Sequence, residues 1–116
     1  MPTAAHHKSA EAFLEAYLRE LSAVAGRSPY TIRHYRTDIG GFLNWCVAHG
    51  QEPLRATRQV FREYLTELKD AGMVPASITR RTSTVHGFYR YLHREGATER
   101  DQLYGVALPK RPKRLP

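Results

Sequence analysis

Apolar residues recur at helical spacing in four segments of the chain, each followed by a glycine: residues 9–24, 28–49, 57–71 and 75–95. Ser9, Ser28 and Thr57 are placed to cap the first three segments, and proline stands near the start of the second and fourth. Strand-like alternation is missing from the pattern. We therefore expect an all-α protein, a compact four-helix bundle, and residues 101–106 are compatible with one more short helix.

The residues expected in the core are those of the four apolar stripes: Phe13, Leu14, Tyr17, Leu18, Leu21, Val24, Ile32, Tyr35, Ile39, Phe42, Leu43, Cys46, Val47, Val60, Phe61, Tyr64, Leu65, Leu68, Ile78, Val85, Phe88, Tyr89 and Leu92.

Chain length and the prolines divide the sequence into three parts. The 116 residues are enough for one domain. Residues 1–8 are polar and are expected to be disordered, and residues 9–107 form the helical domain. Residues 108–116 carry three prolines and four cations with no acid, which predicts a basic linker rather than a helix. Because the chain stops on this linker, we expect the natural protein to continue.

Charge narrows the class of partner. Eighteen Lys and Arg stand against eleven Asp and Glu, a net charge of +7, which predicts a polyanionic partner such as nucleic acid or an anionic membrane surface. No apolar run is long enough to span a membrane. The single cysteine, Cys46, cannot form an internal disulfide, which favours a reducing compartment, the cytoplasm.

The positive charge gathers on the fourth segment. This segment contains four arginines and no carboxylate, and a helical wheel gives it an outward stripe of small and basic residues: Arg80, Ser83, Gly87, Arg90 and Arg94. Such a stripe suits a helix lying in a DNA major groove, although an ordinary solvated basic face would look the same. In the second segment Tyr30, Arg33, His34, Thr37 and Asn44 lie opposite the apolar stripe, and Asp38 is the only acid.

Two motifs then give the sequence a resemblance to a known family. SPYTIRHYRTDI at residues 28–39 fits the pattern S-x-x-T-x-x-x-Y-x-x-D, and FLNW at residues 42–45 follows it. In residues 80–92 the spacing R-x-x-S is followed by F-Y-x-Y-L. Both resemble the N-terminal core-binding (SAM-like) domain of tyrosine recombinases and phage-type integrases, especially the Xer-like branch, and the match runs almost end to end.

The resemblance implies a four-helix domain that forms one jaw of a clamp around double-stranded DNA, with two helices against the major groove. It also implies a catalytic domain in the same parent chain and other recombinase protomers on the DNA. The candidate DNA contacts that it gives by position, with Arg90 added from the outward stripe, are Thr31, Arg33, Tyr35, Thr37, Ser77, Arg80, Arg81, Ser83, Thr84 and Arg90. The wheel places Tyr35 on the buried side and Arg81 at the flank.

The sequence departs from the family pattern at two places. Asp101-Gln102-Leu103 stands where the family usually has an Asn-Pro pair, which bears on the last short helix. His86 stands where a basic residue is common, and a histidine is ordinarily neutral at pH 7.

No catalytic, metal or cofactor site is expected. In the family the nucleophilic tyrosine lies beyond the linker, so no tyrosine of this chain is assigned to catalysis. Cys46 lies on an apolar stripe and is expected to be a core residue. His86 and His93 are seven residues apart without carboxylates or cysteines at ligand spacing, which argues against zinc.

Two other functional classes remain open. A helical protein-interaction module could carry its cations for solubility alone, although the acid-free fourth helix disfavours this reading. A stand-alone helix-turn-helix regulator would need a short recognition helix after a tight turn, which helices of about twenty residues fit poorly.

The linker leads to a prediction about the gene. Reading the frame downstream of Pro116 should reveal an H-x-x-R motif and a later tyrosine, because the catalytic groups of the family follow the linker. A stop codon soon after Pro116 would contradict the expected catalytic domain.

Overall fold

The computed structural model of the chain describes the backbone of residues 2–105 and the side chains of residues 10–105. It contains four α-helices and one short 3-10 helix, in the order α1 (Pro2–Ala23), α2 (Pro29–Ala48), η1 (Pro53–Arg55), α3 (Arg58–Asp70) and α4 (Pro75–Arg94). No strand occurs within residues 2–105. The expected all-α fold with four helices is confirmed, and η1 is an addition between the second and third predicted helices.

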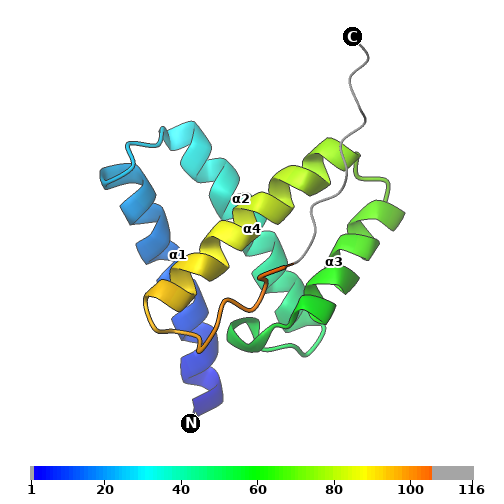
Figure 1. Cartoon of the computed structure of the whole chain (residues 1–116), viewed down its shortest axis with the longest axis horizontal. Coiled ribbons are helices and arrows are strands. Elements are labelled where there is room, and N and C mark those ends of the chain that lie inside the picture. Colours follow the sequence, from blue (N-terminus) through cyan, green and yellow to red (C-terminus); the bar gives the residue numbers. More distant parts are fainter. Residues whose placement is uncertain (1, 106–116) are drawn as a thin grey trace.

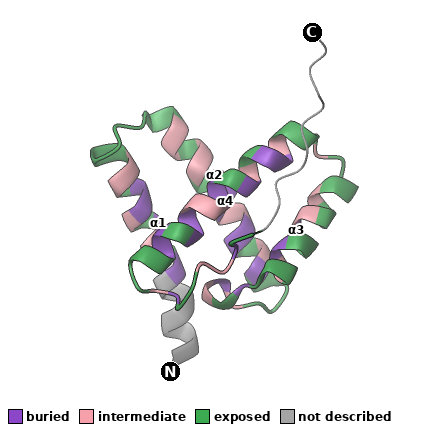
Figure 2. Cartoon of the chain, viewed as in Figure 1, coloured by how far each residue is buried: buried purple, intermediate pink, exposed green. Residues whose placement is uncertain are grey.

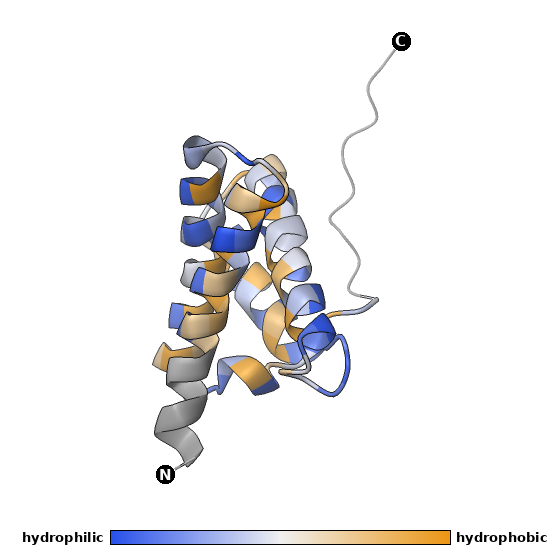
Figure 3. Ribbon diagram, turned by 90° about the vertical axis from the view of Figure 1, so that its left-hand side faces the viewer, coloured by the Kyte–Doolittle hydropathy of each residue, from blue (hydrophilic) through white to orange (hydrophobic). Residues whose placement is uncertain are grey.

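The helices form two hairpins, α1 with α2 and α3 with α4, and α4 crosses α2 (Figure 1). Blue and orange segments alternate along the helices in Figure 3, as amphipathic helices require. Helix α4 packs against each of the other three helices, and its buried residues are spread along its length (Figure 2). It is therefore the central helix of the fold.

Local signals start α2 and α3 and end α1 where the sequence indicates. The Ser28 hydroxyl accepts a hydrogen bond from the Thr31 amide at 3.2 Å, and the Thr57 hydroxyl accepts one from the Val60 amide at 3.1 Å. Gly26 lies between α1 and α2 with φ +66°, a backbone conformation that residues with a Cβ atom rarely adopt. The predicted caps of α2 and α3 are confirmed.

An aromatic cluster around Phe42 forms the centre of the core. Phe42 has no exposed surface, and its ring centroid lies 5.1 Å from those of Phe61 and Tyr64 and 6.0 Å from that of Tyr89. These four side chains come from α2, α3 and α4. The buried hydroxyl of Tyr89 donates a hydrogen bond of 2.6 Å to the carbonyl oxygen of Pro53, which fixes η1 against α4.

The N-terminal expectation is corrected by the structure. Helix α1 begins at Pro2, so Ser9 lies inside the helix and is not its cap, and the segment predicted as disordered has helical backbone from Pro2 onward. Proline favours the first position of a helix, and the two alanines that follow, Ala4 and Ala5, have the highest helix propensity.

Two of the predicted core residues are exposed. Val24 follows the last residue of α1 and is 81% exposed, because the helical stripe does not continue into the turn. Val47 is 52% exposed, because it lies about 100° around α2 from the buried Cys46.

The last short helix is also corrected. Residues 102–105 form a turn, in which the Asp101 carbonyl accepts a hydrogen bond from the Tyr104 amide at 3.1 Å. The Asp101 carboxylate accepts another from the Leu103 amide at 3.3 Å, which is the side-chain competition that disfavours helix. Leu103 is nevertheless fully buried and ties the turn to the core. Residue 106 and the linker at residues 108–116 lie outside the described residues.

Replacing Phe42→Ala should lower the free energy of unfolding by about 3–5 kcal/mol, because it removes the side chain on which three helices pack. Val47→Ala, one turn further along the same helix, is the matched control and should change it by less than about 0.5 kcal/mol. Urea unfolding followed by circular dichroism measures both. Equal stability of the two variants would contradict the assignment of Phe42 to the centre of the core.

Candidate nucleic-acid interface

The two crossing helices share a single carboxylate, and it is buried. Helices α2 and α4 together contain six arginines and one acid, Asp38, which is 1% exposed. Arg80 of α4 binds it through two hydrogen bonds, Nε to Oδ2 at 3.1 Å and Nη2 to Oδ1 at 3.2 Å. These bonds raise the pKa of Arg80 above its ordinary value, because they favour the charged guanidinium. The only acid of the two helices therefore does not contribute an exposed negative group.

Arg81 binds the same carboxylate from a more buried position. Its side chain is 19% exposed, its Nε lies 3.7 Å from Oδ1 of Asp38, and its Nη1 donates to the Tyr64 hydroxyl at 3.2 Å. Gly41 leaves room for this side chain, since a Cβ there would lie 3.0 Å from Nη1 of Arg81. Arg81 thus links α2, α3 and α4 inside the protein.

Arg33 and Arg90 are exposed, and neither has a hydrogen bond or an ion pair within residues 10–105. The Arg33 guanidinium lies 6.0 Å from the ring centroid of Tyr30, which is 64% exposed and also contacts His34 edge to face. These two arginines can meet a phosphate without breaking an existing ion pair.

The remaining arginines of the two helices are paired with α1. Arg36 of α2 bonds to Glu15. Arg94 of α4 bonds to both oxygens of Glu20, at 2.8 and 2.7 Å, and also lies 3.5 Å from Glu95. Arg94 is part of the predicted outward stripe and is exposed, but three carboxylate oxygens already neutralise it.

The predicted hydroxyl contacts divide by exposure. Thr37 and Ser83 are exposed, and Ser77 is half-buried. Thr31 is half-buried within the cap of α2, where its hydroxyl accepts from Ser28 at 3.1 Å. Tyr35 is half-buried against the core, as the wheel indicates.

Thr84 is a correction to the candidate site. It is 6% exposed, and its hydroxyl donates a hydrogen bond of 2.9 Å to the backbone carbonyl of Arg80 in its own helix. A buried hydroxyl with an internal partner cannot reach a ligand on the surface. We name the exposed residues that remain, Arg33, Thr37, Arg80, Ser83 and Arg90, the α2–α4 surface.

One small feature of α4, Gly87, differs from the sequence interpretation, and another, His86, agrees with it. A Cβ at position 87 would lie 2.9 Å from the Tyr17 hydroxyl, so Gly87 makes room for α1 rather than for a groove of DNA. Burial lowers the pKa of His86 below 6.5, so this histidine is neutral at pH 7 and adds no charge to the stripe.

The pairing of Asp38 with Arg80 and Arg81 is the feature that sequence reasoning missed. A signal was present, because Asp38 stands at helical spacing with the apolar residues Tyr35, Ile39 and Phe42 and should therefore face inward. A buried carboxylate needs a cationic partner. The fourth predicted helix, which has no acid, offers the consecutive arginines Arg80 and Arg81.

Cys46 and clusters of metal-binding side chains are the other places where the described residues could hold a reactive site. Cys46 has no exposed surface, and burial raises the pKa of its thiol to about 12, so it is not a nucleophile at neutral pH. No group of three metal-binding side chains occurs among the described residues.

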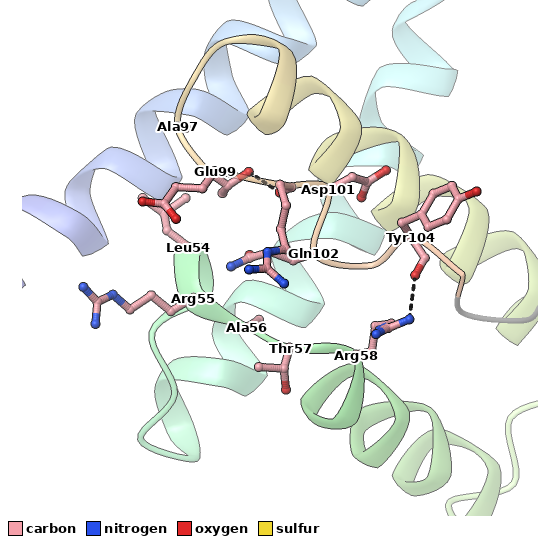
Figure 4. Close-up of a pocket in the computed structure, with 12 residues that line it drawn as sticks. Leu54, Arg55, Ala56, Thr57, Arg58, Ala97, Glu99, Asp101, Gln102 and Tyr104 are labelled. Atoms are coloured by element: carbon pink, nitrogen blue, oxygen red, sulfur yellow. Dashed lines mark hydrogen bonds between the residues drawn. The ribbon is translucent and has the colours of Figure 1, made fainter.

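A cavity of about 930 Å³ lies beside the segment that follows α4 (Figure 4), and no residue of the α2–α4 surface lines it. It is lined by η1, the start of α3 and the segment 97–104, and Arg58 donates to the Tyr104 carbonyl at its edge at 3.3 Å. Neither histidine nor cysteine lines it.

Comparison with known proteins agrees with the fold. The family model described as "Phage integrase, N-terminal SAM-like domain" matches residues 14–96. A tyrosine recombinase XerC of Pseudomonas putida strain F1 is 36% identical over 104 residues, which are 89% of this chain and 35% of that protein. A tyrosine recombinase XerC of Oceanobacillus iheyensis is 31% identical over 107 residues, 91% of this chain and 35% of that protein.

The chain thus spans about a third of the length of the curated relatives it matches. No solved structure matches it significantly. Within residues 2–105, none of the helices combines the length and apolarity needed to cross a membrane.

The family match covers most of the chain and describes an N-terminal domain, so these 116 residues carry that domain and do not contain the catalytic domain of a recombinase. The chain belongs to the phage integrase N-terminal SAM-like domain family.

Proposed function

We propose that this domain binds duplex DNA through the α2–α4 surface, as one jaw of the clamp of a tyrosine recombinase. The observation that carries the proposal is the burial of Asp38. Because it is the one carboxylate of α2 and α4, its burial beneath Arg80 leaves both helices without an exposed acid. A surface of exposed arginines and hydroxyls without carboxylates is what contacts to phosphate require.

The spacing of the cations supports a groove contact. Arg80 and Arg90 are ten residues apart on one face of α4, which corresponds to about 15 Å along the helix axis. The major groove of B-DNA is about 12 Å wide, so the two side chains can reach phosphates on its two sides. Thr37 and Ser83 add hydroxyl donors to the same exposed region.

The relatives support a larger parent protein. Proteins named tyrosine recombinase XerC are about three times as long as the matched region, since the alignment covers 35% of each. The parent of this chain accordingly has a catalytic domain that closes on the DNA from the other side, and several protomers act together on it.

A protein-interaction module is the weaker reading. The large apolar side chains that are exposed among residues 10–105, Val24, Tyr30, Val47, Val74 and Tyr104, come from separate places along the chain. Tyr30 lies near the α2–α4 surface, with its ring centroid 6.0 Å from the Arg33 guanidinium. A surface without an apolar patch does not favour a helix-packing partner.

Charge reversal at the two unpaired arginines tests the proposal. The double variant Arg33→Glu/Arg90→Glu should weaken binding to a labelled duplex strongly and lower the slope of log K against log salt by about 2, one for each lost phosphate contact. Fluorescence anisotropy between about 50 and 200 mM salt measures it, and the unmodified domain should bind with a Kd in the micromolar range or weaker, as non-specific binding does.

The matched control is Arg62→Glu/Lys69→Glu, which changes the net charge equally but on the exposed side of α3. Equal loss in the two double variants would mean that only net charge matters, and would refute the α2–α4 surface. We leave Arg80 unchanged in this test, since Arg80→Glu would place a second carboxylate beside buried Asp38 and threaten the fold.

A further inference from the structure

The guanidinium of Arg80 has two edges that can each hold a pair of acceptors, and the protein uses one of them. Asp38 takes the edge formed by Nε and Nη2, at 3.1 and 3.2 Å. The carboxylate is 1% exposed, whereas the Arg80 side chain is 49% exposed. One side of the guanidinium is thus fixed in the interior while the rest of the group reaches solvent.

The second edge of Arg80 is free. An arginine has five N–H donors, and two of those on Arg80 bind Asp38, which leaves both donors of Nη1 and one of Nη2. No hydrogen bond from these three donors exists to any residue of the range 10–105. The free edge matches two acceptors in one plane, as offered by a phosphate group or by O6 and N7 of guanine.

Asp38 is itself held in place. Nε of Arg81 lies 3.7 Å from Oδ1, the oxygen that also accepts from Nη2 of Arg80, and Nη1 of Arg81 donates a hydrogen bond of 3.2 Å to the Tyr64 hydroxyl. The absence of a side chain at Gly41 gives Arg81 the space for this position. The orientation of Arg80 is therefore set by residues from three helices rather than by its own flexible side chain.

We propose that Asp38 is a positioning residue for DNA binding: it holds Arg80 with its free Nη1–Nη2 edge directed outward, so that this edge binds a pair of acceptors on duplex DNA. The inference rests on the proposed function of the α2–α4 surface. It gives two neighbouring arginines of the family pattern different roles. Arg80 contacts DNA, whereas Arg81 supports Asp38.

For the DNA affinity of the Asp38→Asn variant, the inference predicts a change opposite to the one expected from net charge alone. Asp38→Asn removes a negative charge from a DNA-binding domain, so electrostatics alone predicts tighter binding. Loss of the fixed carboxylate frees Arg80 to adopt many rotamers, so positioning predicts weaker binding, by about fivefold or more. In an Arg80→Ala background, Asp38→Asn should cause no further weakening, since the residue it positions is gone.

Lysine substitution provides a second test that leaves Asp38 in place. Lysine cannot offer two edges, so Arg80→Lys should lose nearly as much affinity as Arg80→Ala. Arg62→Lys is the matched control, because Arg62 is an exposed arginine of α3 that lies outside the α2–α4 surface. The affinity of this variant should stay within about twofold of that of the unmodified domain.

All variants are measured by fluorescence anisotropy with a labelled mixed-sequence duplex at low salt, after circular dichroism melts establish that each is folded. If Asp38→Asn is unfolded, Arg80→Lys and its control decide, because the lysine variant keeps a cation beside the carboxylate of Asp38. Asp38→Asn binding as tightly as the unmodified domain or more tightly would overturn the proposal. An Arg80→Lys loss no larger than that of Arg62→Lys would overturn it as well.

The same measurements distinguish this inference from the proposed function. An unmodified domain without salt-dependent DNA binding would refute the proposed function itself. Binding that depends on Arg33 and Arg90 but is insensitive to the Arg80 and Asp38 variants would refute only the positioning role. A duplex of A·T pairs alone identifies the acceptors: a persisting Arg80→Lys loss assigns the free edge to phosphate, and a vanished loss assigns it to guanine.

Discussion

The buried carboxylate of Asp38 is the constraint on which the arrangement of this domain depends. A charge without exposed surface must be paired inside the protein, and here the partners are consecutive arginines of the central helix, Arg80 and Arg81. The pairing joins α2 to α4 where they cross, and the Tyr64 hydroxyl extends it to α3. Loss of either partner would leave a buried charge without compensation, so the pairing fixes how the two helices cross.

The same pairing determines where the positive charge is exposed. Helix α1 provides Glu15 and Glu20, which neutralise Arg36 and Arg94 at the borders of the crossing helices. Asp38 is enclosed, so the exposed middle of α2 and α4 keeps arginines without acids. This exposed basic surface favours duplex DNA as the partner. The composition alone, with its net charge of +7, left nucleic acid and an anionic membrane equally possible. A preorganised basic surface is what a jaw of a DNA clamp requires.

Helices, caps and most of the core could be predicted because they depend on local sequence. Ser28, Thr57 and the stripe through Phe42 act within a few residues of themselves, and all were confirmed. What escaped prediction depends on long-range contacts. Asp38 and Arg80 are 42 positions apart, and Gly87 acquires its role only from Tyr17 on another helix. Thr84 was a candidate by its position in the family pattern, and neither the hydrogen bond within its own helix nor its burial can be derived from that position.

The direct measurement of the binding surface is a titration of the ¹⁵N-labelled domain with a duplex, followed by the backbone amide shifts. If buried Asp38 leaves α2 and α4 as the basic surface, the largest shift changes will lie at Arg33, Thr37, Ser83 and Arg90, and those of α3 will stay small. Changes concentrated on the outer side of α3, around Arg62, would contradict the account.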